Sequence, residues 1–157
     1  MKTTLALVFA TILCGPAWAV GEGEAQTPVE IWQEDRTIVL DADDVELSDF
    51  QWIARPVVVF ADSTADPRFI KQLDLLAARA GELADRDVVV ITDTDPAEKS
   101  ALRTELRPRG FMLVLIGKDG GVKLRKPAPW NVRELTRVID KTPERQQEVR
   151  DRALLAE

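Results

Sequence analysis

The stretch from Arg55 to Arg68 reads R-P-V-V-V-F-A-D-S-T-A-D-P-R, and it decides the fold of this chain. Its apolar run, Val57–Phe60, is β-branched and too short for a helix, which is typical of a central strand buried on both faces. A polar loop follows and ends in Asp66-Pro67, an N-cap residue with proline at the first helical position. Many α/β proteins place their chemistry at such a strand, loop and helix. This loop contains no cysteine, histidine or glycine-rich phosphate motif. It therefore argues against thiol, histidine and phosphate-loop chemistry at this place and indicates no activity of its own.

The pattern after this stretch predicts a parallel pair of strands. A helix is expected from Asp66 to just before Asp85, because apolar residues recur at helical spacing at Phe69, Leu73, Leu76, Ala77 and Ala80. The apolar run Val88–Thr92 is the second strand, and a right-handed crossover makes it parallel to the first. The carboxyl ends of the two strands therefore bring Asp62, Asp93 and Asp95 to one edge of the sheet.

The middle of the chain completes a mixed sheet. Asp95-Pro96 repeats the N-cap and proline signature and predicts a helix that ends at about Leu106. A third strand is expected at Phe111–Ile116. The glycines of Gly117–Gly121 indicate a tight hairpin, and the alternating Val122–Arg125 indicates an edge strand.

Two helices are expected at the C-terminal end. Asn131 is the N-cap of the first, Glu134 is expected to return the capping bond, and Trp130 is expected to pack against Leu135. Thr142-Pro143 begins the second, which runs to about Leu155 and is charged on most sides. Such a helix lies on the surface or contacts a partner.

The first nineteen residues have the features of a secretory signal peptide. Lys2 precedes an apolar core, Leu5–Leu13, and Ala17-Trp18-Ala19 is a small-x-small cleavage site. A retained membrane anchor is the alternative, although the apolar run is shorter than the roughly 20 residues that a spanning helix needs. Cleavage would remove Cys14, the only cysteine. The expected product is periplasmic or secreted, has no disulfide, and is stabilised by its hydrophobic core alone.

Charge and composition exclude several functions. Removing Lys2 from the 21 basic residues leaves 20 against 27 acidic residues, a net charge of −7. Nucleic acid is therefore not expected as a partner, because its binding depends on neutralising phosphates. The chain has no histidine and no tyrosine, which excludes histidine-based triads and histidine-ligated metals. No cofactor and no membrane insertion after processing are expected.

The segment before the central strand is rich in acidic residues. Val20–Gln33 is expected to be a loose lead-in, and Glu34–Asp49 has seven acids around a β-like run, Thr37–Leu40. Calcium could bind Asp41, Asp43 and Asp44, but the spacing lacks the glycine and the distal glutamate of a calcium loop. The sequence therefore favours a solvated acidic face without a metal.

The order of elements, β-α-β-α-β-β-α, resembles the thioredoxin fold over about residues 47–141. On that pattern Ala65-Asp66-Pro67-Arg68 stands where thioredoxins have Cys-Gly-Pro-Cys. The buried aspartate of thioredoxins falls on Val59, and the cis-proline falls on Phe111. The resemblance thus implies a thioredoxin-like scaffold in which Ala65, Arg68, Val59 and Phe111 replace the redox residues, since disulfide exchange needs a thiolate.

More narrowly, the chain resembles the domain-of-unknown-function family 4174, exported thioredoxin-like proteins. The resemblance rests on Trp52 with Arg55, on Leu83–Asp87, on Phe111 with Leu115–Lys123, and on Ile139-Asp140, Pro143 and Arg145–Glu148. It implies an extracytoplasmic fold and brings no established activity. The domain organisation expected is a signal peptide (1–19), an acidic lead-in (20–46), a thioredoxin-like domain (47–141) and a C-terminal surface helix (142–157).

The favoured hypothesis is a non-catalytic binding or scaffold module. We call the carboxyl edge of the sheet the rim, and its candidate binding residues are Asp62, Ser63, Thr64, Asp66, Arg68, Asp93, Asp95, Arg107 and Arg109. Mixed charges of this kind can recognise an unknown periplasmic protein or a small polar ligand. They can equally neutralise one another, because a surface ion pair contributes less than about 1 kcal/mol.

Three alternatives stay open. The first is an enzyme with Asp62 or Asp93 as general base and Arg109 as anion clamp, which would need carboxylates without an arginine in reach. The second is an envelope factor that recognises partners through Arg145 and Glu148 of the last helix. The third is a nucleic-acid or lipid patch, although the sequence favours a solvated edge there; it would be made of basic residues around the hairpin and the following helix: Lys118, Lys123, Arg125, Lys126 and Arg133.

Overall fold

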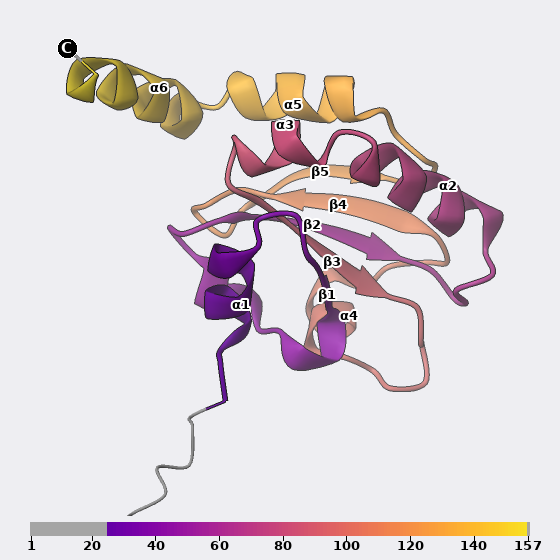
Figure 1. The fold of residues 1–157 in the computed structure, drawn as a ribbon. Coiled ribbons are helices and arrows are strands. Elements are labelled where there is room, and N and C mark those ends of the chain that lie inside the picture. The colour runs from indigo at the N-terminus through magenta and orange to yellow at the C-terminus, as the bar shows by residue number, and fades with distance from the viewer. Residues whose placement is uncertain (1–24, 157) are drawn as a thin grey trace, which may run out of the picture.

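A five-stranded mixed sheet with helices on both faces forms the centre of the protein (Figure 1). The structure, a computed structural model, describes residues 25–156. The strands are β1 (Val39–Asp41), β2 (Arg55–Phe60), β3 (Val88–Asp93), β4 (Met112–Ile116) and β5 (Val122–Lys126), in the spatial order β1-β3-β2-β4-β5. β1 and β2 pair with β3 in parallel, and β4 is antiparallel to both β2 and β5. The predicted parallel pair and hairpin are confirmed. The expected signal peptide and Cys14 lie outside the described residues.

Six α-helices and two short 3₁₀ turns surround the sheet within residues 25–156. The helices are α1 (Pro28–Glu34), α2 (Pro67–Ala77), α3 (Ala80–Ala84), α4 (Ala101–Leu106), α5 (Val132–Asp140) and α6 (Pro143–Leu155). The 3₁₀ turns are η1 (Ala42–Asp44) and η2 (Leu47–Phe50). α2, α3 and α5 cover one face, α1 and α4 lie on the other, and α6 extends beyond the sheet (Figure 1).

Two hydrophobic clusters, one on each face, hold the layers together. All six residues of β2 are buried, and alternate residues of β2 and β3 serve the two sides, as expected of a strand buried on both faces. Under α2, α3 and α5 lie Val57, Val59, Val88 and Val90. On the opposite face Phe60 and Ile91 pack with Trp32 of α1.

Within the described residues, the segment from residue 25 to Gln33 is not the loose lead-in that was expected over Val20–Gln33. Thr27 and Glu30 form a capping box at the start of α1, and Trp32 is fully buried. The Trp32 indole donates a hydrogen bond to the carbonyl of Val88 at 3.3 Å. Because β1 also belongs to the sheet, the folded unit begins before residue 47 and includes this segment.

Helix starts follow the predicted caps at Asp66, Asn131 and Thr142, whose side chains accept from backbone N–H groups. Other local expectations are wrong. The long helix breaks after Ala77 and resumes as α3. The expected capping box at Asn131 does not form. The Glu134 carboxylate instead accepts a hydrogen bond from Arg137 Nη1 at 2.9 Å.

Candidate functional site

The loop after β2 is polar, and its last acidic residue, Asp66, is paired within the protein. Asp62, Ser63 and Thr64 are exposed. The Asp66 carboxylate caps α2 and accepts from Arg68 Nε at 3.0 Å and Nη2 at 2.7 Å. These side-chain hydrogen bonds from Arg68 lower the pKa of Asp66. The charges of Asp66 and Arg68, both predicted to belong to the rim, therefore neutralise one another.

Asp93, expected on the rim, is a buried structural residue. Its carboxylate accepts from the Ser100 hydroxyl at 2.6 Å and from Arg103 Nε at 2.7 Å, and only 4% of its side chain is exposed. Arg103 also donates to the carbonyl of Ala61 at 2.6 Å. This network joins the ends of β2 and β3 to the start of α4. The arginine beside Asp93 argues against its use as a general base.

Sequence reasoning did not single out Ser100 or Arg103. Asp95-Pro96 does not begin a helix, because the Asp95 carboxylate accepts from the backbone N–H of Ala97 at 2.8 Å and forms a turn. Ser100 is the true N-cap of α4. The signal that could have located it is the serine directly before the apolar positions Leu102 and Leu106.

The remaining rim residues lie on an open surface. Arg107 ends α4 in a left-handed conformation, with φ of 49°, and both it and Arg109 are exposed. A Cβ built on Gly110 would lie 3.7 Å from Asp62 Oδ2, so the segment before β4 does return beside the β2 loop. Among residues 25–156, neither Arg107 nor Arg109 forms an ion pair.

The positions that match the redox motif come together in space. Ala65 and Arg68 flank the start of α2, and the Arg68 guanidinium lies 5.5 Å from the centre of the Phe111 ring. Phe111 and Val59 are buried. The place where thioredoxins hold their sulfur atoms thus presents an alanine, an ion-paired arginine and an aromatic ring.

The acidic segment is organised by its own backbone. Asp41 accepts from the N–H of Asp43 at 3.1 Å and caps η1. Burial, then the nearby carboxylates of Asp41 and Asp93, raise the pKa of Asp43. No group of three or more Asp, Glu, His or Cys side chains in residues 25–156 is arranged to hold a metal ion.

Arg145 and Glu148 of α6 point into the protein and are not exposed partner contacts. Arg145 is buried. Glu148 accepts from Arg55 Nη2 at 2.9 Å and pairs with Lys118 Nζ at 3.0 Å, although Arg55 precedes it by 93 residues. Burial opposes ionisation of Glu148, but hydrogen bonds from Arg55 and Lys118 outweigh it and lower the pKa to about 2. This network fastens α6 to the sheet.

The proposed basic patch is largely engaged within the protein. Lys118 also pairs with Asp87 at 2.8 Å, and Lys123 pairs with Asp119 at 2.7 Å. Arg125 donates to the carbonyl of Leu106 at 2.6 Å, and Lys126 lies 4.3 Å from the centre of the Trp130 ring. These contacts argue against a free surface for phosphates.

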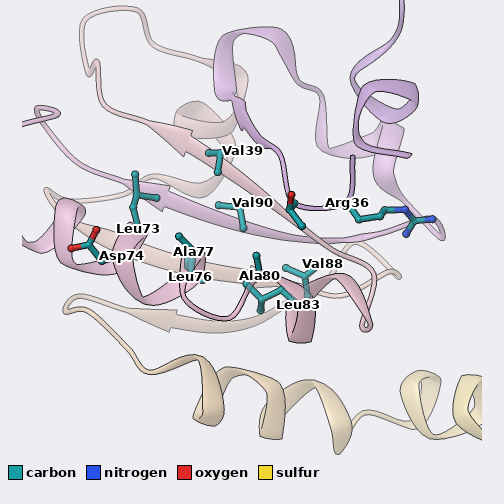
Figure 2. A pocket seen from close by; sticks show the side chains of 11 residues that line it. Arg36, Val39, Leu73, Asp74, Leu76, Ala77, Ala80, Leu83, Val88 and Val90 are labelled. Atoms are coloured by element: carbon teal, nitrogen blue, oxygen red, sulfur yellow. The ribbon is translucent and has the colours of Figure 1, made fainter. Parts of the chain in front are cut away.

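An apolar groove of about 460 Å³, which sequence reasoning missed, lies where α2 and α3 pass the β1/β3 edge of the sheet. Figure 2 shows Leu73, Ala77 and Ala80 of the helices facing Val39 and Val90 of the strands, with Arg36 and Asp74 at opposite ends. The lining residues are Arg36, Thr37, Val39, Leu73, Asp74, Leu76, Ala77, Ala80, Leu83, Val88 and Val90. The volume falls in the range of small-molecule sites, about 300–1,000 Å³.

Comparisons with known proteins identify the fold and a family. The model of the family described as "Domain of unknown function (DUF4174)" matches residues 46–148. No curated protein matches the chain. Within residues 25–156, no helix is both long and apolar enough to cross a bilayer.

Solved structures of thioredoxin-like proteins resemble this one. Prx1a and thioredoxin peroxidase I from Plasmodium yoelii each align with a TM-score of 0.52 at 17% identity, over 69% of this chain and 86% of theirs. Reduced desulfothioredoxin from Desulfovibrio vulgaris Hildenborough aligns with a TM-score of 0.45 at 24% identity, over 67% of this chain and 97% of its own. The thioredoxin-like fold expected from the order of elements is confirmed.

Proposed function

The chain belongs to the DUF4174 family, and we propose that it is an exported, non-redox protein with a thioredoxin-like fold that binds a ligand in its apolar groove. The observation that supports a non-redox role is the replacement of both cysteine positions by Ala65 and an ion-paired Arg68. The sole cysteine, Cys14, belongs to the segment with signal-peptide features. Disulfide exchange has no thiolate to use once that segment is removed.

The groove is a better binding site than the rim because it is concave and apolar. On the rim, Asp66, Arg68, Asp93 and Asp95 already have partners within the protein. Asp62, Ser63 and Thr64, with Arg107 and Arg109, form a polar and exposed surface. A groove with apolar walls and a few polar groups at its ends can remove a ligand's hydrophobic surface from water, which drives binding.

Titration of the exported protein with the neutral apolar dye Nile red tests this function. Ala77 is exposed and lines the groove, so Ala77→Phe fills it and is expected to abolish dye binding. Ala78 is the next residue, is also exposed and does not line the groove, so Ala78→Phe is the matched control and keeps the affinity. Absence of dye binding by the wild type, or equal binding by the two variants, would contradict the proposal.

A further inference from the structure

Charge, and not apolar burial, attaches α6 to the rest of the protein. Within residues 25–156, neither hydrophobic cluster contains a residue of α6, and the single buried residue of this helix is Arg145. Residues 149–156 are exposed, where the helix extends beyond the sheet (Figure 1). The preceding helix, α5, differs, because Val132, Leu135 and Ile139 anchor it in one of the clusters. Few buried apolar contacts are typical of an element that opens locally.

Ion pairs hold α6 in place instead. In the described part of the chain they are Arg145 to Asp140 at 3.8 Å, Glu148 to Arg55 at 2.9 Å and to Lys118 at 3.0 Å, and Arg152 to Asp87 at 3.2 Å. Dissolved salt screens such contacts, since the Debye length falls from about 10 Å at 0.1 M to about 3 Å at 1 M ionic strength. The attachment of α6 should therefore weaken as the ionic strength rises, whereas the hydrophobic attachment of α5 should not.

The docked position of α6 also leaves one buried group unsatisfied. The Nε atom of Arg145 has no hydrogen-bond partner, and among residues 25–156 it is the only such buried side-chain atom. Asp140 lies 3.8 Å away, beyond hydrogen-bond distance, and its carboxylate already accepts from Arg86 at 2.8 and 2.9 Å. A buried donor without a partner destabilises the docked state, and water satisfies this donor once the helix moves away.

We infer that α6 is an ionic latch. It detaches as a unit at the link between Asp140 and Pro143 while the sheet and α5 stay folded, and rising ionic strength shifts the equilibrium towards the detached form. Detachment uncovers Lys118 and Arg55, whose side chain is 3% exposed in the docked form. The latch thus controls access to a pair of cations that bind the Glu148 carboxylate when it is closed. This inference does not depend on the apolar groove.

Amide hydrogen exchange of the exported protein, followed by NMR at about 0.05 M and about 1 M sodium chloride, tests the latch. The amides of residues 146–149 report on it, because they lie beside Glu148 and away from the helix tip. A detached helix of 13 residues is marginal in water, so these amides exchange whenever the latch opens. They are expected to exchange faster than the amides of α5 at both salt concentrations. The higher salt concentration is expected to speed their exchange at least about threefold and to leave α5 unchanged.

Two variants of α6 separate the latch from the stability of the helix itself. Arg152→Gln removes an anchor to Asp87 and is expected to speed exchange at residues 146–149 about two- to fivefold, as an exposed ion pair allows. Arg150→Gln is the matched control, because Arg150 is an exposed arginine whose side-chain hydrogen bonds in the described structure go to Gln147 of the same helix. It is expected to leave the exchange rates unchanged.

Several outcomes would overturn the inference. Equal protection of α5 and of residues 146–149 would show that the two helices unfold together. An equal salt response of both helices, or an equal effect of Arg152→Gln and Arg150→Gln, would contradict the latch as well. Faster exchange of α5 in Arg152→Gln would show that the variant loosens the whole fold, which also argues against a separate opening of α6.

Discussion

Glu148→Gln tests the ion-pair network that fastens α6 to the sheet. The variant keeps the shape of the side chain and removes the charge that Arg55 and Lys118 share. It leaves Arg55, whose side chain is only 3% exposed, without a carboxylate partner. Removing one member of a buried pair is strongly destabilising, because the other charge remains out of water.

The pKa of Glu148 sets the size of the effect and its pH dependence. Burial raises this pKa, but hydrogen bonds from Arg55 and Lys118 lower it to about 2 from the usual 4.5. Such a difference corresponds to about 3 kcal/mol of folding free energy, and solvent at the partly exposed carboxylate reduces this to about 2 kcal/mol. Because the folded pKa is the lower one, the contribution is complete above pH 4.5 and is lost as the pH falls towards 2.

Urea unfolding of the wild type and Glu148→Gln at pH 7 and pH 3 measures this contribution. The expected loss at pH 7 is about 2 kcal/mol, and at pH 3 less than half of it remains. Glu105→Gln, at an exposed position on α4, is the control and is expected to be neutral. A loss below about 0.5 kcal/mol at pH 7, or a loss that is the same at both pH values, would refute this reasoning.

Three further predictions concern the buried parts of the fold. Asp93→Asn is expected to destabilise by about 3 kcal/mol because it leaves Arg103 buried without its counter-charge; urea unfolding measures this, and a neutral effect would show that the pair contributes nothing. Trp32→Ala is expected to lower the free energy of unfolding by about 3–5 kcal/mol, since the indole is fully buried and donates a hydrogen bond to the sheet. An unchanged midpoint of thermal unfolding would show that α1 does not contribute to the folded core. Gln72→Leu is expected to cost about 1–3 kcal/mol, because the buried amide accepts from the N–H of Trp130 at 2.6 Å and donates to its carbonyl at 3.1 Å; hydrogen exchange at the start of α5 should rise, and unchanged protection would contradict this.

The elements that the sequence predicts correctly are those with a local signal. The apolar runs of β2 and β3 and the caps at Asp66 and Thr142 can be recognised within a few residues. The error at Asp95 has a local cause as well, because an aspartate before proline can cap a helix or close a turn with the same side-chain hydrogen bond.

The features that the sequence does not predict depend on long-range packing. α1 is only seven residues long, and just Val29, Ile31 and Trp32 pack against the core, which is too short a pattern to predict a helix. The Arg55–Glu148 pair joins residues 93 positions apart, and Arg103 reaches from α4 to the ends of two strands. The groove is equally hidden, since its walls come from three separate segments whose apolar residues all look like ordinary core.

Trp52 illustrates the same limit on a single residue. It is a large aromatic residue shortly before the central strand, where the sequence alone favours a place in the core, yet 67% of its surface is exposed and its φ is 65°. Its backbone N–H donates to the carbonyl of Lys118 at 2.7 Å, across the start of the hairpin. This contact joins the turn before β2 to the β4–β5 turn and holds the backbone of Trp52 in place.

The central claim is that a thioredoxin-like scaffold acts here without a reactive sulfur. Intact-mass measurement of the exported protein, combined with titration of free thiols under denaturing conditions, tests it most directly. We expect the mass of a chain that begins near Val20, and no titratable thiol in the molecule. A product that retains Cys14, with one titratable thiol per chain, would contradict it.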